Sequence, residues 1–420
     1  MDRRWAVLAL VCASTTSTAL LDQGLPTLFA FLQADFQLSR AEVGLYISAA
    51  EIGTVVTFIL GGWAADAVGI RRVLPAVQAV LGLICAAFAL APTYRQGLAT
   101  LFVYGLAFGV SSPSVSLAVL YWFPARTRAT AMGLRQTGVA LAGIAAAALL
   151  PSFALAFGWR TGLLCISVAI FTSAVAMLWY RDPPDARPIG IVARPSWSQI
   201  RPLIRNRDQL VVNAYAMILF ANQYAISGYL ILYLRDYLES TVVAGGLVLA
   251  VAQGGALCGR ILWGILSDRT FRGRRAPGLQ VAGGIAAALL IALALLPPGV
   301  SLWLLAPLAF GLGFSAMGWH ALRQVLLLEL VPRAIAGVAL GVSQTLSEAG
   351  PVLGPPLFGA LADWAGYRVA WLVMAGLTAF VSLVLMRAVD ERRAAAVSPA
   401  TEPRPLTAPT TRIRTERKKL

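Results

Sequence analysis

The stretch GGWAADAVGIRR at residues 61–72 and the stretch GRILWGILSDRTFRGRR at residues 259–275 decide how this chain folds. Each contains the pattern GxxxD, at Gly62 to Asp66 and at Gly264 to Asp268, and each ends in paired arginines. Both stretches stand between long apolar segments. A motif that occurs twice in equivalent surroundings indicates a chain built from two related halves.

The apolar segments around these motifs are long enough to cross a lipid bilayer. The chain is 58% hydrophobic and 13% charged, with a mean hydropathy of +0.74, whereas about a quarter of the residues of a soluble domain are charged. A spanning helix needs roughly 20 predominantly apolar residues. The sequence predicts twelve such helices, over residues 6–32, 43–64, 73–91, 98–122, 130–154, 161–180, 209–234, 243–265, 277–296, 302–330, 334–358 and 369–388.

The repeat extends beyond the two loop stretches. Eight positions of the first half recur in the second, the first three after 202 residues and the other five after 208: Gly44, Gly62, Asp66, then Pro124, Gly133, Gln136, Gly158 and Arg160. The helices therefore correspond while the loops differ in length. We predict an all-α membrane protein with twelve transmembrane helices in two pseudo-symmetric six-helix bundles.

The distribution of positive charge predicts the orientation in the membrane. With the N-terminus in the cytoplasm, 26 of the 34 Lys and Arg residues fall on cytoplasmic segments, five outside and three within helices. Cytoplasmic loops carry such an excess in membrane proteins. We expect a multi-pass protein of a bacterial inner membrane with both termini in the cytoplasm. The net charge of +15 is then explained by topology and does not indicate nucleic-acid binding.

Two polar stretches mark the boundaries of the expected domains. Residues 181–208, rich in Pro and Arg, are predicted to be a cytoplasmic linker between an N-terminal bundle at 1–180 and a C-terminal bundle at 209–389. Residues 390–420 end in RTERKKL and are predicted to be a disordered basic cytoplasmic tail. Such a tail can contact anionic membrane lipid.

The repeated loop stretches resemble the cytoplasmic loop signature of the major facilitator superfamily, a family of secondary transporters. The resemblance implies two bundles that rock about a mid-membrane site, with these loops latching the cytoplasmic side when the carrier faces outward. The residues that it assigns to gating are Gly62, Asp66, Gly69, Arg71, Arg72, Gly264, Asp268, Gly273, Arg274 and Arg275. A role as helix caps and topology determinants is compatible with gating.

A second stretch bears on the subfamily. YWFPARTRATAMGLRQTG at residues 121–138 resembles a segment common in facilitators of small anions. Drug-proton antiporters of the superfamily usually carry a GP-containing pattern in the fifth span, whereas residues 138–151 read GVALAGIAAAALLP here. This difference disfavours a multidrug transporter without excluding it.

Three carboxyl groups within the spans are candidates for proton coupling, because ionisable groups inside a membrane are costly and mark functional sites. They are Asp22, Glu51 and Glu348. A carboxyl group in surroundings of low dielectric constant can bind and release a proton near neutral pH. Salt bridges between helices or helix-end contacts are the alternative role. Pro26, one turn after Asp22, is expected to kink the first span.

Two arginines are candidates for binding a substrate anion. Arg135 and Arg323 come from different halves, and two guanidinium forks are well suited to a carboxylate. Both lie near enough to the cytoplasmic surface to extend toward it, so a structural or gating role stays open. His320, the only histidine, is a further candidate, although a lone histidine is more often a core residue than a proton relay. The remaining substrate-binding candidates are polar residues, namely Gln136, Asn222, Gln223 and Tyr224.

The sequence offers no nucleotide-binding loop of the form GxxxxGK[ST], no catalytic constellation and no metal-ligand spacing. We therefore expect neither enzyme activity nor a metal or cofactor. The predicted function is proton-coupled uptake of a small organic anion, most simply a carboxylate, by a monomeric secondary transporter. Two alternatives stay open: an efflux pump for a drug or amphipathic metabolite, and a membrane sensor that keeps the fold without transporting.

Overall fold

The computed structural model describes residues 3–183, 197–271, 274–331 and 336–389, and all regular structure within these ranges is helical. Eleven of the described helices are long and apolar enough to cross a membrane. The predicted all-α membrane fold is therefore confirmed. Residues 184–196 of the expected linker and the expected tail at 390–420 lie outside the described residues.

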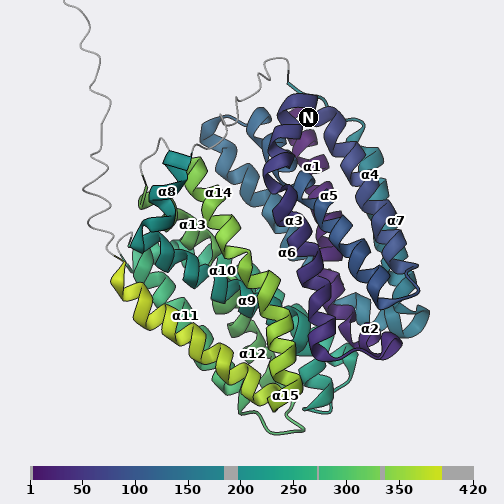
Figure 1. Ribbon diagram of the computed structural model, residues 1–420, viewed down its shortest axis with the longest axis vertical. Coiled ribbons are helices and arrows are strands. Elements are labelled where there is room, and N and C mark those ends of the chain that lie inside the picture. The colour runs from purple at the N-terminus through teal and green to yellow at the C-terminus, as the bar shows by residue number, and fades with distance from the viewer. Residues whose placement is uncertain (1–2, 184–196, 272–273, 332–335, 390–420) are drawn as a thin grey trace, which may run out of the picture.

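The helices of the first half follow the predicted spans closely (Figure 1). Pro26 interrupts the first span in a 3-10 turn, as expected for a residue without a backbone donor. The elements are α1 (Arg3–Gly24), η1 (Leu25–Leu28), α2 (Phe29–Phe36), α3 (Arg40–Val68), α4 (Ile70–Ala89), α5 (Tyr94–Trp122), α6 (Ala125–Phe157) and α7 (Trp159–Met177).

The second half begins with a short helix in the expected linker, where Leu203 packs against Val331 and Ala339. Longer helices follow. The elements are α8 (Trp197–Arg205), α9 (Arg207–Asp236), α10 (Val242–Arg269), α11 (Arg275–Ala294), α12 (Leu302–Leu312), η2 (Gly313–Met317), α13 (His320–Glu329), α14 (Ala336–Ser347), α15 (Ala349–Ala379), η4 (Phe380–Val384) and η5 (Leu385–Ala388).

Two glycines that match in the sequence repeat also match in backbone conformation. Gly158 lies between α6 and α7 with φ 84° and ψ 148°, and Gly366 lies inside α15 with φ 81° and ψ 162°. Side chains strongly disfavour this conformation, so glycine is needed at both breaks. Because α15 continues across Gly366, it contains parts of two predicted spans, and eleven apolar helices correspond to twelve spans.

The tenth span differs from the continuous helix predicted over 302–330. A π-helical turn, η2, separates α12 from α13. The backbone of α10 presses against this turn: a Cβ atom on Gly313 would lie 1.7 Å from the carbonyl oxygen of Ala252, and one on Gly318 would lie 2.7 Å from the Cα of Gly259. Packing between helices, which a local pattern does not reveal, accompanies this irregular turn.

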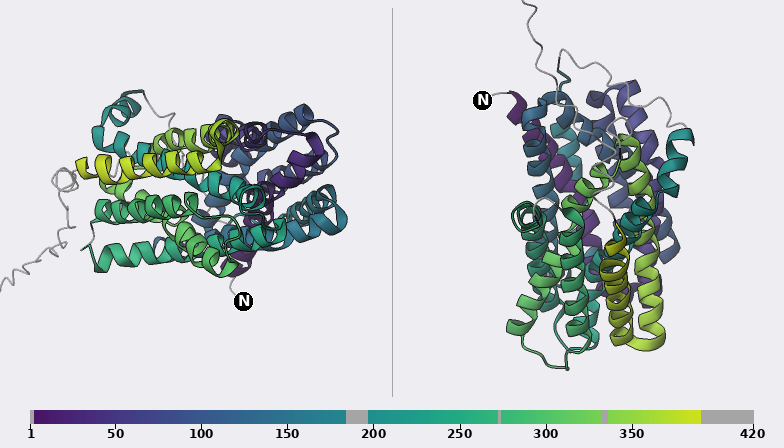
Figure 2. Two further views of the ribbon diagram at one scale, coloured as in Figure 1. Left: turned by 90° about the horizontal axis from the view of Figure 1, so that it is seen from below. Right: turned by 90° about the vertical axis from the view of Figure 1, so that its left-hand side faces the viewer.

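The two halves lie side by side as separate bundles (Figures 1 and 2). We call the end at which α1 begins the N-face, and the opposite end, at which α3 begins, the far face. The ribbons of the two halves converge at the far face, at the lower end of Figure 1, where α15 runs beside the first half.

Hydrogen bonds between the halves are concentrated at the far face. Arg40 at the start of α3 donates to Asp236 over 3.4 Å and to the carbonyl oxygen of Ala362 over 3.1 Å. Its guanidinium lies 3.6 Å from Asp363, whose carboxylate also accepts from the backbone amides of Arg40 and Ala41. We call Arg40, Asp236 and Asp363, together with Tyr229 and Pro355, the far-face joint.

Backbone groups make up much of this joint. The Tyr229 hydroxyl lies 2.8 Å from the carbonyl oxygen of Arg40 and 2.7 Å from that of Pro355, and it can donate to either. A Cβ atom on Gly44 would lie 2.7 Å from the Pro355 carbonyl carbon, and one on Gly359 would lie 2.3 Å from the Arg40 carbonyl oxygen. Helices α3 and α15 therefore meet backbone to backbone.

Candidate functional site

Three carboxyl groups from different elements come together between the halves. Asp22 lies on α1, Glu51 on α3, and Glu348 at the junction of α14 and α15, and Glu51 is close enough to the other two to interact electrostatically. Each has a hydrogen-bond donor: Gln23 donates to Asp22 over 2.6 Å, Tyr224 donates to Glu51 over 2.8 Å, and Gln344 donates to Glu348. We call Asp22, Glu51 and Glu348 the carboxyl cluster.

A basic group adjoins the carboxyl cluster in the second half. Arg323 is 2% exposed, and its guanidinium is close enough to Glu348 to interact electrostatically. His320 stands one turn earlier on α13, and its Nε2 lies 2.8 Å from Gln223 Oε1. The His320 ring stacks on Trp319, with 4.3 Å between the ring centroids. The predicted His320 and Arg323 thus lie in one site with the predicted carboxyl groups.

A chain of buried hydrogen bonds holds Arg323 in place. Its Nη1 donates to the Ser347 hydroxyl over 2.7 Å, and that hydroxyl donates to the carbonyl oxygen of Ser343 over 2.7 Å. The Ser343 hydroxyl donates to Asn213 on α9 over 2.5 Å. The polar stripe along the eleventh span therefore supports a guanidinium group on the tenth.

Among the described residues, two hydrogen bonds between side chains join the halves at this level, away from the far-face joint. One is the bond from Tyr224 on α9 to Glu51 on α3. The other runs from the Gln253 amide on α10 to Gln23 Oε1 on α1, over 3.1 Å. Because Gln23 in turn donates to Asp22, the second bond also reaches the carboxyl cluster.

Arg135 and Gln136 lie on α6, outside the group formed by Arg323 and His320. Gln136 is exposed, whereas Arg135 is half-buried beside Cys12 of α1. The Nε of Arg135 is buried, and no described residue accepts a hydrogen bond from it. Asn222 points into its own half: it is fully buried and its amide donates to Thr378 of α15 over 2.5 Å. That contact is part of the packing of the second half.

Arg260 on α10 belongs to the site, although its position in the sequence gave no sign of this. It lies close enough to His320 to interact electrostatically. Its neighbour Gly259 packs against Phe314 and Gly318, directly before α13. As with Arg135, the Nε of Arg260 is buried, and it has no hydrogen-bond partner among the described residues.

The residues expected to form the gate are described in part. Gly69 has φ 88° and is the N-cap residue directly before α4, and Arg71 and Arg72 at the start of that helix are exposed. In the second loop, Arg275 is paired with Asp268 over 2.5 Å and with Glu329 of α13 over 3.5 Å, so this contact lies within one half.

The other gate residues add less. Arg274 is exposed, and a Cβ atom on Gly264 would have nothing within 4 Å. Gly62 and Asp66 lie in α3, and Gly273 lies outside the described residues.

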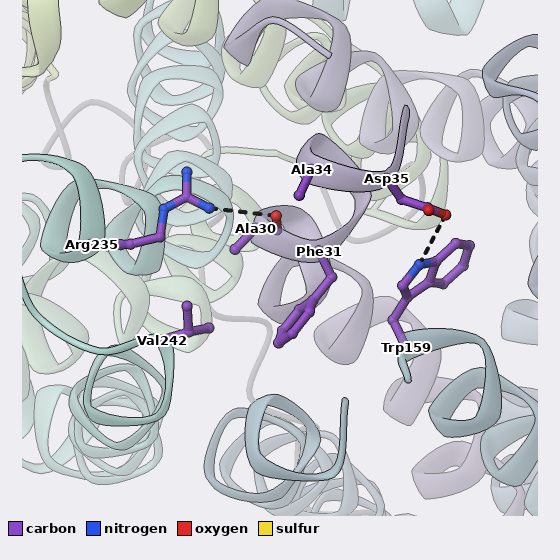
Figure 3. A pocket seen from close by; sticks show the side chains of 7 residues that line it. All are labelled: Ala30, Phe31, Ala34, Asp35, Trp159, Arg235 and Val242. Carbon is purple, nitrogen blue, oxygen red and sulfur yellow. Dashed lines mark hydrogen bonds between the residues drawn. The ribbon is translucent and has the colours of Figure 1, made fainter. Parts of the chain in front are cut away.

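A cavity of about 410 Å³ opens at the far face, away from the carboxyl cluster (Figure 3). Arg235 and Asp35 stand on opposite sides of it, but both already have partners. Arg235 pairs with Asp236 over 2.6 Å and donates to Gln33, while Asp35 pairs with Arg160 over 2.6 Å and accepts from Trp159. The cavity therefore offers little free charge to a ligand. Within the described ranges, no group of three His, Cys, Asp or Glu residues is placed to hold a metal ion.

Comparison with known proteins gives consistent relatives. The family model described as Major Facilitator Superfamily matches residues 8–347 and 320–418 of the chain. An uncharacterised transporter of this type from Mycobacterium tuberculosis is 28% identical over 88% of this chain and 81% of its own length. A hexuronate transporter from Bacillus subtilis is 26% identical over 86% of this chain and 88% of its own length.

A solved structure shares the fold. It is a bacterial homologue of the human lysosomal transporter Spinster, in an inward-facing and unoccupied conformation. The TM-score is 0.80 at 16% sequence identity, covering 95% of this chain and all of the other. The two proteins therefore share the same overall fold.

Proposed function

Because the chain belongs to the Major Facilitator Superfamily, we propose that it is a secondary active transporter that takes up a small organic anion together with protons. The observation that carries this proposal is the meeting of the carboxyl cluster with Arg323 and His320 where the two halves touch. Titratable and basic groups inside a membrane are expensive, and transporters place them along the path of ions and substrates.

The acidic and basic groups suit different parts of the cargo. Asp22, Glu51 and Glu348 can each carry a proton, and as carboxyl groups they would repel an anion when charged. Arg323, His320 and Arg135 can attract that anion. The Bacillus subtilis relative is named for a hexuronate, which is itself a small carboxylate. That relationship supports a carboxylate as the substrate class.

The far-face joint supports alternating access as the mechanism. We propose that the N-face is cytoplasmic, so that the formed joint closes the outer side of the carrier. Transport would require the joint to open while the loops at Gly62–Arg72 and Gly264–Arg275 close the inner side. We further propose that the protein works as a monomer in a bacterial inner membrane, with its basic tail on anionic lipid.

Uptake by right-side-out vesicles tests this proposal. Vesicles containing the protein are supplied with radiolabelled galacturonate, benzoate or succinate, with and without an inward proton gradient. We expect at least one of these anions to accumulate more with the gradient, and Glu51→Gln to abolish that increase. Glu42→Gln is the matched control, because Glu42 lies on the same helix but is bonded to Ser39 near its start.

The other outcomes separate the alternatives. Accumulation that is indifferent to the gradient would contradict proton symport. Binding of an anion without flux would identify a sensor. Extrusion of amphipathic dyes, with no uptake of any anion, would identify an efflux pump.

A further inference from the structure

Helices α6 and α10, one from each half, run antiparallel and touch along a defined register. A Cβ atom on Gly246 would lie 2.5 Å from the carbonyl oxygen of Ala147, and one on Gly143 would lie 3.0 Å from the side-chain Cδ of Gln253. From this contact toward the N-face, Arg135 is eight residues beyond Gly143 and Arg260 is seven residues beyond Gln253. At about 1.5 Å per residue, the two arginines lie at the same depth, about 11 Å from the contact.

The direction of each side chain follows from the same helices. Seven residues are close to two full turns, so Arg260 lies on the face of α10 that carries Gln253, which bonds to Gln23 of α1. On α6, Gly143 faces α10 and Gly138 faces Thr16 of α1. At about 100° per residue, Arg135 lies between these two directions. Both arginines therefore border the region enclosed by α1, α6 and α10.

Arg135 and Arg260 differ from Arg323 in their hydrogen bonding. The Nε atoms of Arg135 and Arg260 are both buried, and neither has a hydrogen-bond partner in the described part of the chain. Arg323 already donates to Ser347 at the end of the chain that leads to Asn213. A buried cationic donor without a partner is costly, and an anionic acceptor removes that cost.

We propose that Arg135 and Arg260 hold the carboxylate group of the transported anion between α6 and α10, one guanidinium from each half. Each fork offers its Nε–H and an Nη–H to the two carboxylate oxygens, a geometry that lysine does not provide. Arg323 then acts as a positioning residue for Glu348 and His320. This inference rests on the proposed function, since it names the group of the substrate that the site recognises.

The first test is geometric and needs no substrate. The natural cysteines Cys12, Cys85, Cys165 and Cys258 are replaced by Ser, and a protease site is introduced between residues 184 and 196. In this background we expect the Arg135→Cys/Arg260→Cys pair to be joined by a short bifunctional thiol reagent, so that the two halves stay together after cleavage. The Arg95→Cys/Arg260→Cys pair is the control, because Arg95 lies at the far face. Failure of the first pair to cross-link overturns the proposal.

The second test measures recognition by thermal unfolding of the purified full chain with galacturonate, benzoate, succinate or inorganic phosphate. For the anion that stabilises the native protein, Arg135→Gln and Arg260→Gln should each raise the half-maximal concentration at least tenfold. The double variant should add little, because both groups hold the same carboxylate. Lysine variants should recover only part of the response, and Arg95→Gln should leave it unchanged.

The results distinguish this inference from the function beneath it. If no anion stabilises the native protein or enters vesicles, the proposed function fails. If a carboxylate stabilises the native protein and stabilises the Arg135→Gln and Arg260→Gln variants at the same concentrations, the function stands and the assignment to Arg135 and Arg260 is wrong. Stabilisation by phosphate as strong as by any carboxylate, through the same arginines, would overturn the carboxylate assignment. Removal of two guanidinium groups whose buried Nε atoms have no described partner should not lower the unfolding temperature without anion, whereas loss of a structural pair would lower it.

Discussion

Gln223 and Tyr224 are neighbours on α9 but bond to different halves of the molecule. Tyr224 donates to Glu51 in the first half, whereas Gln223 lies against His320 in the second. Two adjacent residues therefore connect the carboxyl cluster with the basic group beside it. The Tyr224 hydroxyl donates to Glu51, so a change in the protonation of Glu51 changes this hydrogen bond. Because Tyr224 belongs to α9, the change acts on the contact between α9 and the first half.

Tyr224→Phe tests this connection. We predict several-fold slower proton-driven uptake, because the variant removes a hydrogen bond between the halves that involves a proposed proton carrier. The free energy of unfolding should fall by only about 1 kcal/mol, the usual net contribution of one hydrogen bond. Uptake into vesicles and thermal unfolding are the two measurements.

Tyr215→Phe is the matched control for this prediction. The Tyr215 hydroxyl is also buried and donates to the carbonyl oxygen of Leu279 over 3.0 Å, but both residues belong to the second half. It should lose similar stability and keep its uptake rate. Equal slowing of transport in both variants would show that Tyr224 acts only through packing.

At the scale of single residues, candidate site residues could be predicted from the sequence, but their contact partners could not. Asp22, Glu51 and Glu348 could be chosen because a charge within an apolar span is unusual. Arg260 stands closer to the end of its span, where an arginine commonly reaches the membrane surface. Only the packing of Gly259 on Gly318 reveals that it lies beside His320. Asn222 and Gln223 are candidates by the same depth argument, yet a rotation of about 100° along the helix directs Asn222 toward Thr378 and Gln223 toward His320.

At the scale of elements, the positions of the spans were predictable, because an apolar segment that crosses a bilayer must satisfy its own backbone hydrogen bonds and therefore forms a helix. The breaks within them were predictable only where a residue type forces them. Pro26 produces a 3-10 turn in the first span. The π-helical turn in the tenth span has no proline, and it lies where Gly313 meets the backbone of Ala252. A contact between segments that are distant in sequence leaves no local pattern to read.

Gly366→Ala tests the glycine break inside α15. We predict a loss of about 1–3 kcal/mol in the free energy of unfolding, because a Cβ atom strains a backbone with φ 81° and ψ 162°. Gly158→Ala should behave alike, since its backbone is equivalent. The unfolding temperature in detergent, followed by the fluorescence of a thiol-reactive dye, provides the measurement.

Gly376→Ala, in the helical part of α15, is the control for this experiment. Nothing lies within 4 Å of the position that its Cβ would occupy, and alanine favours helices over glycine. Its stability should be unchanged or slightly higher. If Gly366→Ala were as stable as Gly376→Ala, the backbone strain at Gly366 would be absent.

At the scale of the whole molecule, the far-face joint bonds the two halves together at one end. Arg40→Ala removes the guanidinium that reaches Asp236 and Asp363. We predict a larger population of molecules with the far face open, several-fold above the native protein, because partly exposed ion pairs contribute up to about 1 kcal/mol each. Distances between spin labels at Arg95→Cys and Trp364→Cys, in the cysteine-free chain, provide the measurement.

Arg160→Ala is the control for the far-face joint. Arg160 also forms an ion pair at the far face, with Asp35, but both residues belong to the first half. Its removal should leave the distribution of label distances as it is in the native protein. Identical distributions for the Arg40→Ala and Arg160→Ala variants would show that the ion pairs of Arg40 do not hold the far face closed.

The composition of the far-face joint also bears on how such proteins diversify. Tyr229 bonds to two carbonyl oxygens, and Asp363 accepts from two backbone amides. Main-chain atoms are present whatever side chains mutation supplies around them. If the joint closes the carrier as we propose, a lineage can replace the charges of the carboxyl cluster, and with them its preferred cargo, without having to rebuild that closure.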